Sequence, residues 1–162
     1  MPDSFRIVNI GDSVPWGQGL PEEQKYDTQV KNALLPRFPG GVSLQRLAHS
    51  GAVIGARPVT GNPAPGEVPV SRLTIIEQCD SFTDSPETVD LVMVNGGIND
   101  VGVATILNPF ALVPSLRNQI QAACHGGMLG LLRKVSARFT KASCRILVTG
   151  YYKILSDKSN PL

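Results

Sequence analysis

A serine at position 13 stands where the chain could carry out nucleophilic chemistry. An apolar run over residues 5–10 leads directly into Gly11-Asp12-Ser13, and such a run predicts a buried first strand. Glycine lets the backbone turn sharply, so the turn would present Ser13 at the carboxyl end of that strand, where open α/β sheets place their sites. A serine hydroxyl is a weak nucleophile until a base takes its proton, and the tripeptide alone more often marks a helix N-cap.

Two later stretches strengthen the case for a site. Residues 49–55 read His-Ser-Gly-Ala-Val-Ile-Gly, and the apolar residues 90–95 lead into Gly96-Gly97-Ile98-Asn99-Asp100. With these three turns the chain resembles the SGNH (GDSL-type) hydrolase family of esterases and lipases. Gly11-Asp12-Ser13 matches the family's first block, Gly51 its second and Gly97-x-Asn99-Asp100 its third, in the family's order. The resemblance covers most of the chain but only about the first two-thirds of the family's domain.

The resemblance implies a serine hydrolase that acts on carboxylic esters and needs no cofactor. Ser13 would be the nucleophile that forms an acyl-enzyme. The backbone N–H groups of Ser13 and Gly51, with the side-chain amide of Asn99, would form the oxyanion hole. These residue types suit that role, because a glycine lets substrate approach its N–H closely and an asparagine donates without bringing a charge. The implied partners are small-molecule esters, lipids or acylated glycans.

The family's last block, Asp-x-x-His, would supply the general base, and residues 150–162 do not contain it. We therefore expect the chain to be truncated at its C-terminus relative to an intact hydrolase, with severely impaired turnover unless another segment or chain supplies the base. His49 could reach the cleft, because it lies two residues before Gly51, whereas His125 lies beside the apolar stripe of a helix. The alternative function is an inactive or binding-only relative.

Two further alternatives carry less weight. Asp12 and Asp100 could serve as acids, but each also fits a turn or helix-capping carboxylate. A flavodoxin-like nucleotide or phosphate binder could use residues 11–19, yet this loop has neither the G-x-G-x-x-G nor the G-x-x-x-x-G-K pattern.

Hydrophobic periodicity predicts the elements that would position the three turns. Strands are predicted over residues 42–47, 90–95 and 144–149 besides the first, and helices over 22–35, 70–79 and 114–141. The last helix carries an apolar stripe that includes Cys124 and Leu131, and it could break at Gly126-Gly127. A loop over 55–69, rich in proline and glycine, would either frame the substrate cleft or be a plain surface loop.

The alternation of strands and helices argues for an α/β fold with a parallel sheet covered on both faces. The family resemblance implies a flavodoxin-like, three-layer α/β/α architecture with strand order 2-1-3-4. One such domain would span residues 1–162. The fourth strand would then leave an apolar edge open.

Composition limits the other classes of function. Apolar residues make up 42% and charged residues 17% of the 162-residue chain, which is ordinary for a globular protein. A net charge of +2 is too small to indicate binding to nucleic acid or a membrane surface. The three cysteines are widely spaced and form no cluster with histidine, so no structural metal is expected. No signal peptide or membrane-spanning stretch is present, which favours a cytoplasmic location.

Overall fold

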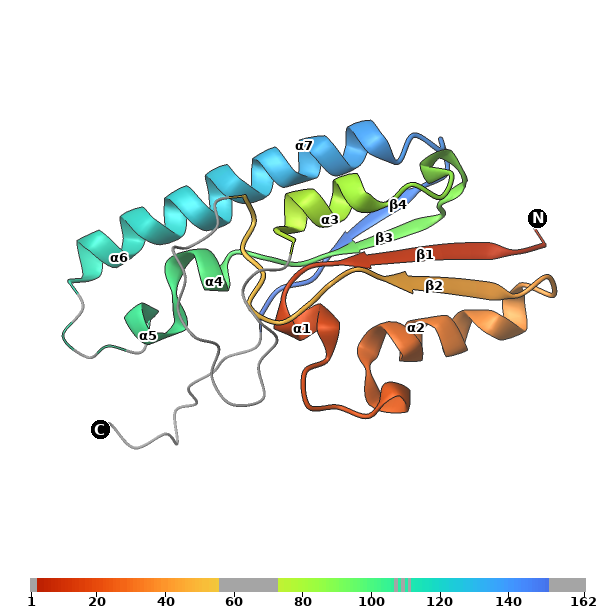
Figure 1. Cartoon of the computed structure of the whole chain (residues 1–162), viewed down its shortest axis with the longest axis horizontal. Coiled ribbons are helices and arrows are strands. Elements are labelled where there is room, and N and C mark those ends of the chain that lie inside the picture. The colour runs from red at the N-terminus through yellow and green to blue at the C-terminus, as the bar shows by residue number, and fades with distance from the viewer. Residues whose placement is uncertain (1–2, 56–72, 107, 109, 111, 152–162) are drawn as a thin grey trace.

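Four parallel strands form the central sheet, in the order β2-β1-β3-β4 (Figure 1). The computed structural model describes residues 3–55, 73–106, 108, 110 and 112–151. The strands are β1 (Phe5–Ile10), β2 (Val42–Arg46), β3 (Leu91–Val94) and β4 (Arg145–Val148). This order confirms the predicted parallel α/β sheet, and the strand bounds differ from the predicted ones by only a residue or two.

The strand register brings the turns after the strands to one edge of the sheet. Asn9 of β1 pairs with Arg46 of β2 on one side and with Met93 of β3 on the other. β1 is therefore central, and its last four residues are buried. Because all four strands run in the same direction, the chain leaves β1, β2 and β3 at neighbouring points.

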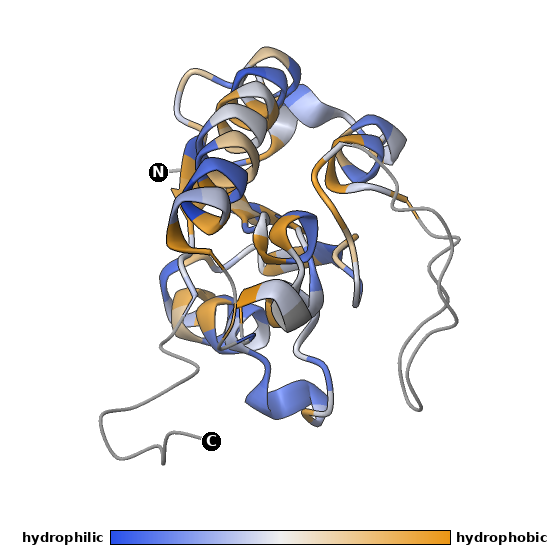
Figure 2. Cartoon of the chain, turned by 90° about the vertical axis from the view of Figure 1, so that its left-hand side faces the viewer, coloured by the Kyte–Doolittle hydropathy of each residue, from blue (hydrophilic) through white to orange (hydrophobic). Residues whose placement is uncertain are grey.

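Helices cover both faces of this sheet (Figure 1). Helices α3 (Ile75–Ser81) and α7 (Met128–Arg138) pack on one face, while α2 (Tyr26–Leu34) packs on the other. The larger core lies between the sheet, α3 and α7 and includes Val8, Ile10, Ile75, Val92, Leu131 and Val135. A smaller core under α2 is built on Ile7, Val42 and Met93. Figure 2 looks onto the carboxyl ends of the strands, with apolar residues concentrated between the helical layers.

In the structure, three shorter helical segments replace the single helix predicted over residues 22–35. A 3-10 turn, η1 (Glu22–Gln24), precedes α2, and a second, η2 (Leu35–Arg37), follows it. Lys25 separates η1 from α2 with an extended conformation, φ −68° and ψ 134°. The break redirects the chain so that Asp27, in the first turn of α2, is buried against the sheet.

The predicted helix over residues 114–141 does not break at its glycines. Instead α6 (Val113–Ile120) continues through a π-helical segment, η4 (Gln121–Gly127), into α7. Figure 1 shows α6 extending past the carboxyl ends of the strands. Only the C-terminal half of the predicted stripe is therefore buried, and Cys124, which belongs to that stripe, is exposed. Its Sγ lies against Gly97, where a Cβ atom would come within 3.1 Å of it.

The last strand of the described sheet has uncovered apolar residues. Ile146, Leu147 and Val148 of β4 are 36%, 44% and 45% exposed.

Among the described residues, no helix is long and apolar enough to cross a membrane, and no group of three or more His, Cys, Asp or Glu side chains could hold a metal ion.

Candidate active site

The turn after β1 presents Ser13 at the start of a short helix, α1 (Ser13–Trp16). Gly11 has φ +150°, and a Cβ atom there would lie 2.4 Å from Cγ of Pro15 and 2.9 Å from the carbonyl oxygen of Asn95. Only glycine fits this turn. The N-cap is Asp12, whose Oδ1 accepts a hydrogen bond from the Val14 N–H at 3.0 Å. Asp12 thus caps the helix. Ser13 is the first residue of the helix and is partly exposed.

A buried glutamine of α3 holds this turn from the side. Oε1 of Gln78 accepts a hydrogen bond from the Gly11 N–H at 2.8 Å, and its Nε2 donates one to the Gly11 carbonyl at 3.0 Å. Gln78 is fully buried. Sequence reasoning missed this residue, because a glutamine on a short helix ordinarily faces solvent.

The turns that carry Gly51 and Asn99 contact each other directly. Nδ2 of Asn99 donates a hydrogen bond to the carbonyl oxygen of Ala52 at 2.9 Å. An asparagine amide has two N–H donors, so this bond uses one of them. The neighbouring Asp100 accepts the Ile54 N–H at 3.1 Å with each carboxyl oxygen. Gly51 has φ +74°, is exposed, and would have no atom within 4 Å of an added Cβ.

The Gly51 turn is also bonded to the Ser13 turn. The N–H of His49 donates to the Gly11 carbonyl at 3.2 Å. The hydroxyl of Ser50 donates to Oε1 of Gln18, in the loop that follows α1, at 2.5 Å. The segment that contains Gly51 is therefore fixed beside both other turns.

A tyrosine after β4 joins the Ser13 and Asn99 turns. The Tyr151 hydroxyl accepts a hydrogen bond from the Ile98 N–H at 3.2 Å and donates one to Oδ2 of Asp12. Burial raises the pKa of Asp12 above its ordinary 3.8, although the bonds from Tyr151 and Val14 oppose that shift. Burial and the Asp12 charge likewise raise the pKa of Tyr151.

Known structures share this arrangement of elements. A comparison with protein-family models finds no match, and a comparison with curated proteins finds none either. Among solved structures, the lipase Lip_vut3 from a goat rumen metagenome matches 91% of this chain with a TM-score of 0.67 at 14% identity. Phospholipase A1 from Streptomyces albidoflavus NA297 matches 98% with a TM-score of 0.59 at 18% identity. AlinE4, an SGNH-hydrolase family esterase, matches 91% with a TM-score of 0.53 at 20% identity.

This chain has the SGNH-hydrolase fold. It spans 64% of the length of the lipase and of the phospholipase, and 59% of the length of AlinE4. Within this SGNH-hydrolase fold, the three residues singled out from the sequence, Ser13, Gly51 and Asn99, lie on three linked turns. Direct hydrogen bonds join the Gly51 turn to each of the other two, and the Tyr151 hydroxyl bridges the Ser13 and Asn99 turns.

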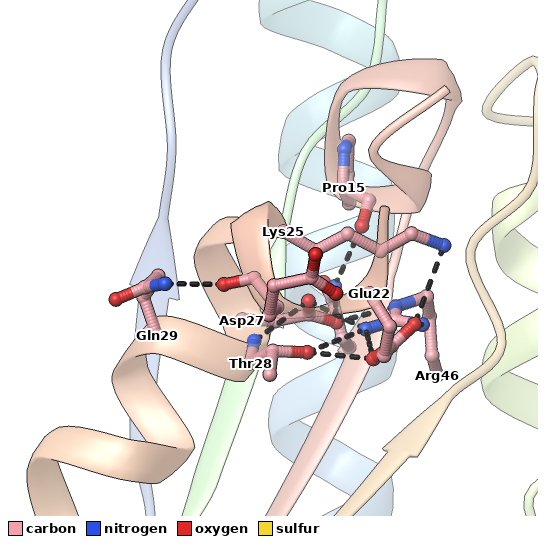
Figure 3. Close-up of polar contacts among 9 residues, drawn as sticks. Pro15, Glu22, Lys25, Asp27, Thr28, Gln29 and Arg46 are labelled. Carbon is pink, nitrogen blue, oxygen red and sulfur yellow. Dashed lines mark hydrogen bonds and ion pairs between the residues drawn. The ribbon is translucent and has the colours of Figure 1, made fainter. Parts of the chain in front are cut away.

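A polar network that is centred on the buried Asp27 holds the Ser13 turn in place (Figure 3). Nδ2 of Asn9 donates to the Pro15 carbonyl at 3.0 Å and to Oδ2 of the fully buried Asp27 at 2.7 Å. Arg46 donates to both Asp27 oxygens, at 2.6 and 2.7 Å, and also pairs with Glu22. These carboxylates raise the pKa of Arg46. The network ties α1 to β1, α2 and β2.

Among the described residues, neither histidine forms a hydrogen bond with the Ser13 hydroxyl. Nδ1 of the buried His49 lies 2.9 Å from the Ser50 carbonyl oxygen, and its Nε2 lies 2.7 Å from the Leu73 carbonyl oxygen. Both ring nitrogens thus face acceptors, although a neutral imidazole has only one N–H. His125 is exposed on η4.

The predicted cleft loop, from residue 56 onward, and residues 152–162 lie outside the described residues.

Proposed function

We propose that this chain carries the nucleophile and the oxyanion donors of a serine hydrolase that acts on carboxylic esters. Support comes chiefly from the bond between the Asn99 amide and the Ala52 carbonyl. That bond holds a neutral side-chain donor beside the exposed peptide of Gly51. The donor comes from the turn after β3, which is far from Gly51 in the sequence. Neutral donors that converge on one point are what a developing oxyanion requires. The proposed substrates are small esters, lipids or acylated glycans.

The proposed reaction proceeds through an acyl-enzyme. Oγ of Ser13 bonds to the ester carbonyl carbon while its proton passes to a base. The N–H groups of Ser13 and Gly51 and the Asn99 amide then bind the negatively charged oxygen, at about 2.7–4 kcal/mol for each donor. When the carbon–oxygen bond to the alcohol breaks, the alcohol leaves with a proton, and water then hydrolyses the acyl-enzyme to the free acid.

The base is the missing part of this proposal. Because both nitrogens of His49 face backbone carbonyls, we expect severely impaired turnover by the 162-residue chain alone. Added imidazole can act as an external base. The test is hydrolysis of p-nitrophenyl acetate with and without imidazole, by the parent and by Ser13→Ala.

A small rate that depends on Ser13 and rises with imidazole would support the proposal, once the direct reaction of imidazole is subtracted with Ser13→Ala. Equal rates for the parent and Ser13→Ala under both conditions would overturn it. Strong labelling of Ser13 by a fluorophosphonate without imidazole would instead contradict the expected impairment.

Binding without turnover is the second candidate function, and the arrangement of His49 favours it. The same three turns would then bind an ester without attacking it. An ester analogue that binds the parent and Ser13→Ala equally, with no hydrolysis by the parent even with imidazole, would support this candidate over the first.

A further inference from the structure

We propose that Tyr151 is a positioning residue of this site, a role that rests on the hydrolase function proposed above. Its hydroxyl lies between the turns that carry Ser13 and Asn99. It accepts the Ile98 N–H at 3.2 Å and donates to Oδ2 of Asp12. Asp12 directly precedes Ser13, and Ile98 directly precedes Asn99. One hydroxyl therefore links the neighbours of the nucleophile and of the side-chain oxyanion donor.

Asp12 carries this link into the nucleophile helix. Its second oxygen, Oδ1, caps α1 by accepting the Val14 N–H at 3.0 Å. Asp12 is fully buried, and hydrogen bonds to a carboxylate in such surroundings are stronger than bonds between neutral groups. A continuous chain of hydrogen bonds thus runs from Val14 through Asp12 and Tyr151 to Ile98. It sets the separation between the two turns.

The same contacts show that Tyr151 acts by geometry and not as the base. Its hydroxyl proton is donated to Asp12. Burial and the nearby Asp12 charge also raise the pKa of Tyr151, so the phenol keeps its proton at neutral pH. The position of the catalytic groups is enough to change the rate, since a misplacement of such a group by about 1 Å can cost on the order of 100-fold in rate.

Tyr151→Phe removes this hydroxyl alone, and Tyr26→Phe is the matched control. The Tyr26 hydroxyl donates to Oδ1 of Asn9 at 3.3 Å, whereas Nδ2 of Asn9 makes the bonds to Pro15 and Asp27. Tyr26→Phe therefore leaves those two bonds in place, and it does not touch the link through Tyr151. The measurement is Ser13-dependent hydrolysis of p-nitrophenyl acetate by the full chain in imidazole. For Tyr151→Phe we expect kcat to fall about tenfold with KM nearly unchanged, because the separation of the turns affects the tetrahedral intermediate more than the bound ester. Tyr26→Phe should stay close to the parent.

Phenylboronic acid gives a second measurement, because it forms a tetrahedral adduct with a serine hydroxyl. We expect its affinity to fall about tenfold in Tyr151→Phe, which follows the same loss of transition-state stabilisation. Should Tyr151→Phe not fold, Asp12→Asn tests the same link. That variant keeps an oxygen for the N-cap but removes the charged acceptor of the tyrosine hydroxyl, and the same losses are expected.

The two ways to fail are distinguishable. If the parent hydrolyses the ester and binds the boronate, and Tyr151→Phe matches Tyr26→Phe in both measurements, the positioning role is overturned. If the parent shows no Ser13-dependent hydrolysis and no adduct, the proposed function is overturned, and the role of Tyr151 with it.

Discussion

The side-chain amide of Gln78 pairs with the peptide group of Gly11 in both directions, at 2.8 and 3.0 Å. The pairing provides partners for both the N–H and the carbonyl of Gly11, at the sharpest point of the turn that leads to Ser13. It also ties α3, which follows the Gly51 segment in the chain, to the end of β1. The turn is therefore held by a residue 67 positions away.

Gln78→Ala should destabilise the protein because it leaves the Gly11 N–H buried without its partner, while the Gly11 carbonyl keeps the bond from the His49 N–H. One unsatisfied buried group costs about 1–3 kcal/mol, so we expect the free energy of unfolding to fall by about that amount. Chemical denaturation measures this loss. Gln119→Ala, on exposed α6, is the control and should change little. Equal stability of the two variants would show that water replaces the Gln78 amide.

Glycine at position 11 should be less replaceable than glycine at position 51. Gly11→Ala combines a backbone in the positive-φ region with a contact of 2.4 Å to Pro15, and we expect a loss of about 2–4 kcal/mol. Gly51→Ala meets open space, so only backbone strain of about 1–2 kcal/mol applies. Thermal unfolding of both variants gives the comparison. A larger loss at position 51 would contradict the geometry of the two turns.

The link between Arg46 and Asp27 should contribute strongly to stability. Arg46→Ala leaves the fully buried Asp27 carboxylate without its cation, which typically costs about 3–5 kcal/mol. The control is Lys134→Ala, which breaks an ion pair with Asp80 between partly exposed side chains and should cost less than about 1 kcal/mol. Urea denaturation of both variants tests this difference, and similar values for the two would contradict it.

The Asp12 carboxyl should make stability depend on pH. Burial raises its pKa above 3.8 in the folded chain, so the folded chain holds this proton more tightly than the unfolded chain. Its contribution to the free energy of unfolding then decreases as pH rises from the unfolded-state pKa through the folded-state pKa. Asp12→Asn removes the titration and keeps an N-cap oxygen.

We therefore expect the free energy of unfolding of Asp12→Asn to increase relative to that of the parent as pH rises from about 4 to about 7. Urea denaturation of both proteins at several pH values measures the difference. A difference that stays constant over this range, or moves in the parent's favour, would contradict the raised pKa.

The sequence predicted the strands of the sheet because apolar runs that end in turns mark buried strands. The resemblance to the SGNH hydrolases implied the strand order, and it singled out Ser13, Gly51 and Asn99. Gln78 and Tyr151 escaped prediction, since a polar side chain carries no local signal of the distant peptide that it will bond. Tyr151 bonds Asp12 across 139 positions, and only the folded sheet brings them together.

Two of the predicted helices differ from the observed ones for physical reasons. The helix over residues 22–35 was predicted as continuous because its apolar spacing is regular, but burial of Asp27 beside Arg46 redirects the chain at Lys25. The long helix was predicted to carry one apolar stripe that could break at Gly126-Gly127. The helix does not break there, and the stripe is exposed at Cys124 because α6 and η4 run beyond the end of the sheet.

The π-helical segment η4 is wider than an ordinary α-helix by one residue per turn, and it lies where Cys124 contacts Gly97. Deleting a single residue between Gln121 and Gly127 would return this segment to α-helical winding, with α6 and α7 keeping nearly the same relative orientation. The contact of Cys124 with Gly97, the glycine two positions before Asn99, would then change. A length change of one amino acid would thus alter the packing beside the Asn99 turn while the sheet stayed as it is.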